Sequence, residues 1–341
     1  MVQKSNPASK VQSRNRPAGL MGSTVAGTLA ACTLLVSSPA TSAQAYPVKP
    51  IRFIVSTAPG GSPDILARIV AQKLSESMGQ QVIVDNRAGA SGIIGTEIVA
   101  KSAPDGYTIL LGTSLNIGAM PVLKKRMPYD ADKDLAPVTH LAWVANVVGL
   151  HPSVPATTVA ELVQVARSRP LNFASSGNAS PAHLGGELFN VLAGTKMTHV
   201  PYKGAGPAAG DFIAGQVQVF MGSPLVLIPH MQTGRARLIA TTGAIRDPLL
   251  PQLPTVAETL PGFEITQWWG VVVPARTPSA IIERLNRELV SAVRQPDVQE
   301  KLRQQGTTPL TGTPEEFRRV IAEERVRVAR IAKQAGIRLD D

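Results

Sequence analysis

The chain has 341 residues, of which 44% are hydrophobic and 4% aromatic, and its formal net charge is +10. This length is enough for two domains that each bury a core, and a composition near the globular average excludes disordered and fibrous proteins. Basic and acidic residues are mixed along the chain, with no basic run and no RNP-like aromatic motif. We therefore expect no nucleic-acid partner despite the positive charge.

The first 45 residues differ from the rest of the chain, because they contain no acidic residue. Four basic residues precede a weakly apolar stretch from 18 to about 36: Lys4, Lys10, Arg14 and Arg16. The segment ends in small residues at Ala43 and Ala45. A charged start, an apolar middle and a small-residue exit predict a secretory signal peptide over residues 1–45, cleaved after Ala45, and a periplasmic location.

Two alternatives concern the same segment. A transmembrane anchor is less favoured, because the apolar run is short and interrupted by Gly and Thr. A lipoprotein signal at Cys32 is the minority alternative, since apolar TLLV follows the cysteine where a polar tether is expected. Cleavage after Ala45 removes four of the 34 basic residues, none of the 24 acidic residues and the only cysteine, which leaves a net charge of +6. The mature chain then has no disulfide.

Alternating strands and helices follow the signal segment. Apolar runs at 51–56, 81–85 and 107–112 predict strands, and helices are expected at 64–78 and before about residue 103. Strands rich in Ile, Val and Leu that alternate with helices imply a parallel sheet covered by helices.

The same pattern returns after a long predicted strand at 139–152. Strands are expected at 171–174, 197–202, 216–221 and 237–243, with helices at 159–167 and after the turns at 175–180 and 203–206. A second long strand is predicted at 264–274, followed by helices at 278–293 and 314–334. We therefore predict an α/β protein with two lobes, whose chain crosses twice beside a cleft: residues 46–146 and 267–341 form lobe 1, and residues 147–266 form lobe 2.

Glycine and serine turns occur at strand-to-helix joints in both halves, at 58–62, 112–114, 175–180 and 203–206. The first turn of a helix leaves backbone N–H groups unpaired, and the helix dipole makes that end partly positive. A carboxylate fits there without an arginine. Each turn alone is also explained by ordinary capping, but the repetition in both halves favours a ligand site.

Other motifs are weak. Gly204, Gly206 and Gly210 resemble a dinucleotide fingerprint, but no acidic residue lies between Phe212 and Arg246 to bind a ribose, so we expect no cofactor. His183 and Glu187 have helical spacing without a third ligand nearby, so we expect no metal. The chain has no GxSxG, HExxH or Walker motif, and we expect no enzyme.

Several longer motifs indicate a family. The segments PGGSPDILARIVAQKL, FASSGNASPAHLGGELF, HVPYKGAGPA and WWGVVVPARTP resemble the substrate-binding proteins of tripartite tricarboxylate transporters, the Bordetella uptake gene (Bug) family. The resemblance covers residues 46–341. It implies a type II periplasmic binding fold, in which two lobes with central, mostly parallel sheets close on a small organic acid.

The resemblance also implies ligand contacts. In the first lobe these are Ala58, Gly60, Gly61, Asp64, Thr113 and Ser114, and in the second lobe Ser176, Asn178, Ser180, His183, Tyr202 and Lys203. We add Ser223, and Trp268 as a possible wall of the cleft. Many relatives carry an acidic residue where this chain has Gly222 and Ser223, so we expect a dicarboxylate or an aromatic acid rather than an amino acid.

Three functions remain open at this point. The first is a monomeric solute-binding protein that delivers a small carboxylate, either a di- or tricarboxylate or an aromatic acid, to membrane transporter subunits. The second is an exported serine hydrolase that uses Ser176 or Ser180 with His183. Glu187 is the only evident carboxylate that could orient the histidine as the third member of such a triad. The third is a ligand sensor that acts on a membrane signalling protein, which needs the same closing lobes.

Overall fold

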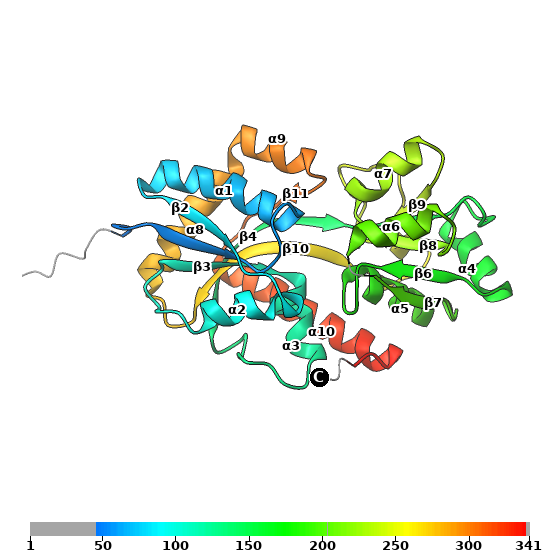
Figure 1. The fold of residues 1–341 in the computed structure, drawn as a ribbon, viewed down its shortest axis with the longest axis horizontal. Helices are drawn as coiled ribbons and strands as arrows, with labels where there is room; N and C mark the ends of the chain where they lie inside the picture. The colour runs from blue at the N-terminus through cyan, green and yellow to red at the C-terminus, as the bar shows by residue number, and fades with distance from the viewer. Residues whose placement is uncertain (1–45, 203, 339–341) are drawn as a thin grey trace, which may run out of the picture. The chain divides into compact units, whose positions relative to one another are not determined.

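Strand–helix units at two places in the chain determine the architecture (Figure 1). The computed structural model describes residues 46–202 and 204–338. The predicted signal peptide and its alternatives at Cys32 therefore lie outside the described residues. All described residues belong to one compact unit, which begins at Ala45.

The first lobe is built on a six-stranded sheet in the order β11-β4-β10-β3-β1-β2. Its strands are β1 (Ile51–Val55), β2 (Val82–Asn86), β3 (Thr108–Thr113), β4 (Leu135–Ala145), β10 (Thr266–Pro274) and β11 (Thr308–Pro309). The βα units make β1 parallel to β2 and β3, whereas β10 runs antiparallel to β3 and β4. The sheet is thus mixed, because β10, which returns from the second lobe, runs opposite to β3 and β4, and β11 also runs opposite to β4.

Helices cover both faces of this sheet. They are α1 (Ser62–Met78), α2 (Ile93–Ala100), α3 (Met120–Leu123), α8 (Ser279–Arg294), α9 (Pro296–Gln304) and α10 (Pro314–Ala335). One core cluster joins α1 and α8 to the sheet, as Leu74 and Leu289 show, and a second joins α2 and α10 through Val99 and Phe317. The sequence predicted α1, α2, α8 and α10 but neither α3 nor α9, which are short and start next to or at a proline.

The second lobe has a five-stranded sheet in the order β7-β6-β8-β5-β9. Its strands are β5 (Val147–Leu150), β6 (Asn172–Ser175), β7 (Thr198–Pro201), β8 (Val219–Gly222) and β9 (Arg237–Thr241), and its helices are α4 (Val159–Ser168), α5 (Pro181–Ala193), α6 (Ala205–Ile213) and α7 (Pro224–Gln232). Strand β6 is parallel to β7 and β8, and β5 is antiparallel to β8 and β9. Helix α7 was not predicted, because two prolines interrupt its sequence.

The chain crosses between the sheets at Asn146 and again before β10. The predicted long strand 139–152 is therefore two strands, β4 and β5, which belong to different sheets. Asn146 donates from Nδ2 to the carbonyl oxygen of Met221 at 2.8 Å and accepts from Gln267 Nε2 at 2.9 Å. The bond with Gln267 connects the two crossing segments, and the bond to Met221 connects the first of them to β8.

Helix α10 contacts both lobes. Phe317 and Ile321 in its first half pack in a first-lobe core cluster, and Val328 and Ile331 join the second-lobe cluster against α5. Between them, Glu324 is 6% exposed beside Trp268 and Arg327. The helix is therefore a second physical link between the lobes, in addition to the crossing strands.

The buried Glu324 gives a prediction about pH. Burial, together with Glu264, raises the pKa of Glu324 from 4.5 to about 7, although Arg327 opposes the shift. Because the folded state disfavours the charged carboxylate, the free energy of unfolding falls as the pH rises from about 4.5 through 7. We expect Glu324→Gln to raise stability by up to about 3 kcal/mol at pH 8 and to change it little at pH 4.5. Urea unfolding at both pH values measures this, and a less stable variant at pH 8 contradicts it.

Candidate ligand-binding site

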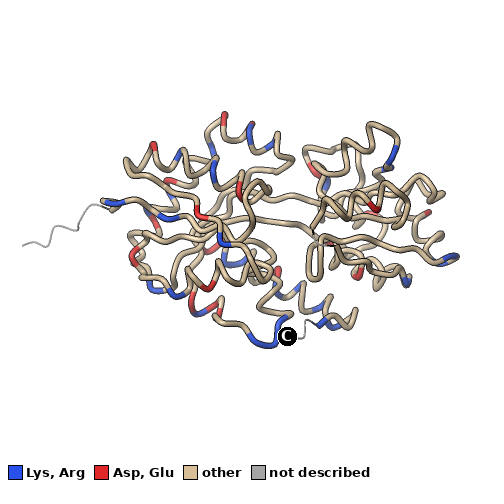
Figure 2. Tube along the Cα trace, viewed as in Figure 1, with Lys and Arg blue, Asp and Glu red and all other residues tan. Residues whose placement is uncertain are grey.

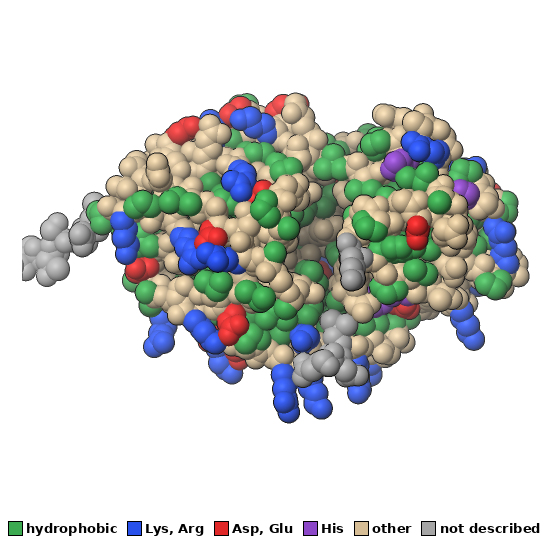
Figure 3. Space-filling view, viewed as in Figure 1, with side chains coloured by type: hydrophobic (Ala, Val, Ile, Leu, Met, Phe, Trp, Pro, Cys, Tyr) green, Lys and Arg blue, Asp and Glu red, His purple; other side chains and the backbone are tan. Residues whose placement is uncertain are grey.

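A cleft of about 300 Å³ lies between the two sheets and is lined by residues of both lobes. Figure 3 shows the surface hollowed at this place. The first lobe contributes the turn that opens α1, the second lobe contributes the starts of three helices, and the crossing segments provide Val144, Asn146, Gln267 and Trp269. Among the described residues that line it, none is Lys, Arg, His, Asp or Glu.

Four helices begin at this cleft. Gly61, Ser62 and Pro63 open α1; Pro181 and Ala182 open α5; Ala205 opens α6; and Ser223 is the N-cap of α7. The N-terminal end of each helix carries a partial positive charge and N–H groups without intrahelical partners. A neutral cleft with four such ends favours an anion that needs hydrogen-bond donors.

The predicted first-lobe turn is present, and Asp64 holds it in place. Asp64 is 3% exposed and accepts hydrogen bonds from the Gly60 N–H at 2.9 Å and from Asn86 Nδ2 at 3.0 Å. Burial alone would raise the pKa of Asp64, but the hydrogen bonds from Arg68, Gly60 and Asn86 lower it. The carboxylate therefore stays charged and stabilises the turn, whereas Gly61 of the same turn lines the cleft.

Other predicted first-lobe residues lie near the cleft without lining it. Ala58 and Gly60 are exposed, while Thr113 and Ser114 are buried. The Thr113 hydroxyl accepts from the Asn116 N–H at 3.1 Å, and Asn116 Nδ2 donates to Ser56 Oγ at 2.9 Å. Thr113 thus caps the π-helix η2 (Ser114–Ala119), and Asn116 connects this helix to Ser56, which directly follows β1.

The second-lobe loop between β6 and α5 presents one predicted contact to the cleft, Ser176. Asn178 of the same loop is exposed. Ser180 is the N-cap of α5, and its hydroxyl accepts from the His183 N–H at 3.4 Å. Among these three predicted residues, only Ser176 faces the place where a ligand would lie.

The geometry does not support the hydrolase alternative. The ring Nδ1 of His183 accepts from the Ala179 N–H at 3.0 Å, and burial lowers the pKa of His183 to about 4. A different serine, Ser175, lies 2.6 Å from His199 Nε2, but Ser175 is fully buried. Neither contact gives a serine in the cleft an adjacent base.

The remaining predicted contacts have different surroundings. The Tyr202 hydroxyl donates to Asp211 Oδ2 at 2.8 Å, and Lys203 lies outside the described residues. Ser223 lines the cleft.

Trp268 was assigned to the wrong face of β10. It is 2% exposed and packs edge-on against Phe317, with 5.4 Å between ring centroids, in the core cluster that includes α10. Trp269 lines the cleft instead. Successive side chains of a strand point to opposite faces, so the choice between neighbouring tryptophans depends on the orientation of the strand.

Sequence reasoning missed four polar residues of the cleft: Asn146, Gln267, Gln305 and Thr307. Asn146 was visible as a single amide within the apolar run WVANVVGL, and Gln267 precedes an apolar segment in the same way. Gln305 and Thr307 follow α9, which the sequence did not predict. No local pattern places that loop beside the cleft.

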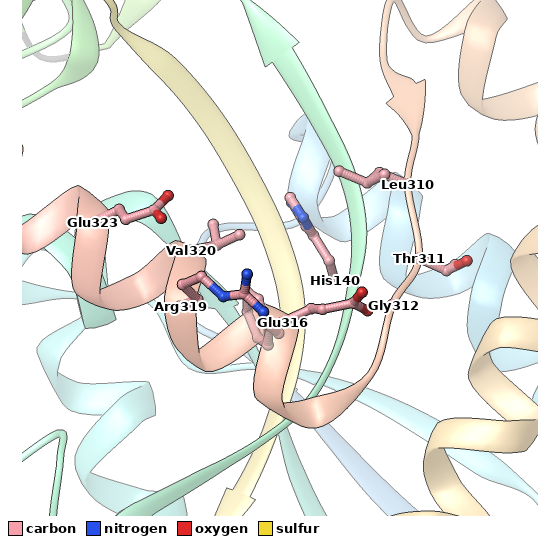
Figure 4. A pocket seen from close by; sticks show the side chains of 9 residues that line it. His140, Leu310, Thr311, Gly312, Glu316, Arg319, Val320 and Glu323 are labelled. Atoms are coloured by element: carbon pink, nitrogen blue, oxygen red, sulfur yellow. The ribbon is translucent and has the colours of Figure 1, made fainter.

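A larger cavity of about 370 Å³ lies beside α10 and is less suited to an anion. Figure 4 shows His140 between Leu310 and Val320, with Glu316 and Glu323 nearby. The pKa of Glu316 is lowered, mainly by hydrogen bonds from Thr313, and that of His140 is lowered to about 4 by burial. The cavity is therefore lined by two carboxylates, the guanidinium of Arg319 and a neutral imidazole, so its acidic side chains outnumber its basic one.

In the part of the chain that the structure describes, no cluster of three or more His, Cys, Asp or Glu side chains is suitable for a metal ion, and no helix is both long and apolar enough to cross a membrane. Basic and acidic residues are interspersed along the trace (Figure 2).

The two-lobed α/β fold and its neutral, helix-lined cleft are those of a periplasmic solute-binding protein. The model of the tripartite tricarboxylate transporter family receptor matches residues 66–337, and the chain belongs to this family. BugT of Bordetella pertussis is 38% identical over 304 residues, which cover 87% of this chain and 93% of BugT.

Solved structures agree with this assignment. The R. palustris protein Rpa4515, solved with adipate, has a TM-score of 0.77 and 36% identity, and the match covers 86% of this chain and 99% of that one. MatC from Rhodopseudomonas palustris, with bound malate, has a TM-score of 0.71 and 28% identity, with 84% and 99% covered. The periplasmic binding protein BugD has a TM-score of 0.72 and 29% identity, with 87% and 100% covered.

Proposed function

We propose that this protein is an exported solute-binding protein that captures a small organic carboxylate in the cleft and delivers it to a tripartite tricarboxylate-type membrane transporter. The observation that carries the proposal is the meeting of four helix N-termini at a cleft whose described lining residues include no charged side chain. A carboxylate binds there through backbone N–H groups and hydroxyls, and the partial positive charges of the helix ends stabilise it.

The binding contacts come from both lobes. Gly61 and Ser62 of the first lobe face Ser176 and Ser223 of the second across the same cleft. A ligand that contacts both sets favours the closed arrangement, because it binds that arrangement more tightly than an open one. No covalent bond forms, and release follows when the lobes separate.

The cleft also favours an acid with two polar ends. Beyond the helix starts lie the amides of Asn146 and Gln267, the Thr307 hydroxyl and the apolar ring of Trp269. A dicarboxylate places one carboxylate at the helix ends and the other beside the amide N–H groups of Asn146 and Gln267, whereas the Thr307 hydroxyl donates to the Leu302 carbonyl oxygen at 2.7 Å. The adipate and malate in the two related structures are acids of this kind.

A thermal-shift series on residues 46–341 tests the proposal. We expect adipate, malate or another carboxylate of a panel with tricarboxylates, aromatic acids and amino acids to raise the melting temperature. At 100 times its Kd a ligand adds about 2.7 kcal/mol to the stability of the folded state. The neutral dimethyl ester of the same acid is the control and should give no shift.

Two outcomes contradict the proposal. One is chemical conversion of the acid, which mass spectrometry of the incubated sample detects. The other is the absence of any shift in a protein that native mass spectrometry shows to be free of bound ligand. A shift by an amino acid alone would contradict only the expected ligand class.

A further inference from the structure

Two imidazoles lie behind the second-lobe loop that contributes Ser176 to the cleft. His199 on β7 places its Nε2 atom 2.6 Å from Ser175 Oγ. Ser175 Oγ donates its single hydrogen to the Gly177 carbonyl at 3.0 Å and accepts the Gly177 N–H at 3.1 Å. The remaining contact to Oγ is therefore made by His199 as a donor from Nε2.

His183 holds the other end of the same loop. Its Nδ1 atom accepts the Ala179 N–H at 3.0 Å. Ala179 has a φ of 62°, a left-handed conformation that residues with a side chain seldom adopt. An acceptor at this N–H helps to keep Ala179 in that conformation, and α5 begins two residues later with Pro181 and Ala182, which line the cleft.

The two rings form one unit. They are stacked with 3.9 Å between centroids and 10° between planes, and Phe173 stacks on the other side of His199 at 5.0 Å. Burial lowers the pKa of both His183 and His199 to about 4, and for His199 the neighbouring His183 adds to the shift. Both rings are therefore neutral at pH 7, which leaves His183 Nδ1 free to accept a hydrogen bond.

We propose that His183 and His199 are positioning residues for the anion site: together they hold the loop 175–180 in the conformation that presents Ser176 and the α5 N-terminus to a carboxylate. This inference rests on the proposed function of the cleft. Neither imidazole lines the cleft, so each acts through the loop backbone and not through a ligand contact. His183, expected from the sequence as a ligand contact, takes this indirect part instead.

Crossed amide substitutions test the proposal. The amide of Asn reaches about as far as His Nδ1, and the amide of Gln about as far as His Nε2. At position 183, where Nδ1 is used, His183→Asn keeps the acceptor and His183→Gln displaces it. At position 199, where Nε2 is used, His199→Gln keeps the donor and His199→Asn loses it. All four variants lose the ring stack, so each pair isolates the hydrogen bond.

The first readout is the Kd of adipate, measured at pH 7 by calorimetry. We expect His183→Asn and His199→Gln to stay within about threefold of each other, and their partners His183→Gln and His199→Asn to bind at least tenfold more weakly, about 1.4 kcal/mol. Equal affinities within each pair, whether both intact or both weakened, would overturn the proposal.

The second readout needs no ligand. Hydrogen exchange of the Gly177 and Ala179 amides should be faster in His183→Gln and His199→Asn than in their partners. If the unchanged protein binds no carboxylate, the proposed function fails, and the exchange rates still decide whether the imidazoles hold the loop. Identical exchange within both pairs removes the positioning role.

Discussion

Ser223→Asp is expected to weaken carboxylate binding at least 100-fold while leaving the fold intact. Ser223 lines the cleft and is the N-cap of α7, with backbone angles φ −61° and ψ 143°. Asp is as good an N-cap as Ser, so the helix keeps its start. A second negative charge about 4 Å from a bound carboxylate is unfavourable by about 4 kcal/mol at an effective dielectric constant of 20.

Two control variants make this result specific. Ser223→Asn introduces a side chain of nearly the same size as Asp but without its charge. We expect its affinity for the carboxylate to stay within about tenfold of that of the unchanged protein. Thr313→Asp makes a comparable N-cap change at α10, whose start lies outside the cleft lining, and should leave the affinity unchanged. Calorimetry with the acid that gives the largest thermal shift measures all three. Undiminished binding by Ser223→Asp would mean that no carboxylate lies near the start of α7.

The strand–helix order of both lobes could be predicted from the sequence, because apolar runs alternate with amphipathic segments. The α1 turn was predictable for a related reason. Gly60 has a φ of 84°, which favours glycine, and Pro63 and Asp64 are typical of a first helical turn. Local features of this kind depend only on residues that are neighbours in the chain, so they can be predicted from the sequence.

The assignment of side chains to the cleft was harder for a physical reason. Polar residues at helix starts serve either the ligand or their own backbone, and Asp64, Thr113 and Ser180 all serve the backbone. Trp268 and Trp269 differ only in which face of β10 they occupy, and the twist and pairing of the sheet decide that. Such choices depend on contacts between distant segments.

The lobe boundaries also depend on contacts between distant segments. Asn146 was expected to end the first lobe, and its amide instead connects the two crossing segments through Gln267 and binds β8 of the second lobe through Met221. Helix α10 packs on α5 through Val328 and Ile331, although it follows a first-lobe strand in the chain. These contacts join residues more than 70 positions apart, which no local pattern indicates.

Gly270→Ala is expected to destabilise the protein by about 3 kcal/mol, the upper range for overpacking a core. A Cβ atom at Gly270 would lie 2.3 Å from Phe317 Cζ and 2.6 Å from the Thr139 carbonyl oxygen. Phe317 belongs to α10 and is 1% exposed, and Thr139 belongs to β4, which is paired with β10. Neither neighbour can move without separating β10 from β4 or lifting α10 from the sheet.

The matched control is Gly210→Ala in α6, where an added Cβ meets no atom within 4 Å. Since Ala is the better helix former, we expect this variant to be as stable as the unchanged protein or more stable by up to about 1 kcal/mol. Urea unfolding of both variants measures the difference. Gln267 and Trp269 line the cleft and belong to the same strand, β10. If the Gly270→Ala protein folds, it should therefore also bind the ligand more weakly. A Gly270→Ala protein as stable as the Gly210→Ala control would show that the β4–β10 pair and α10 yield to a methyl group, and that the first-lobe core is less tightly packed than these distances require.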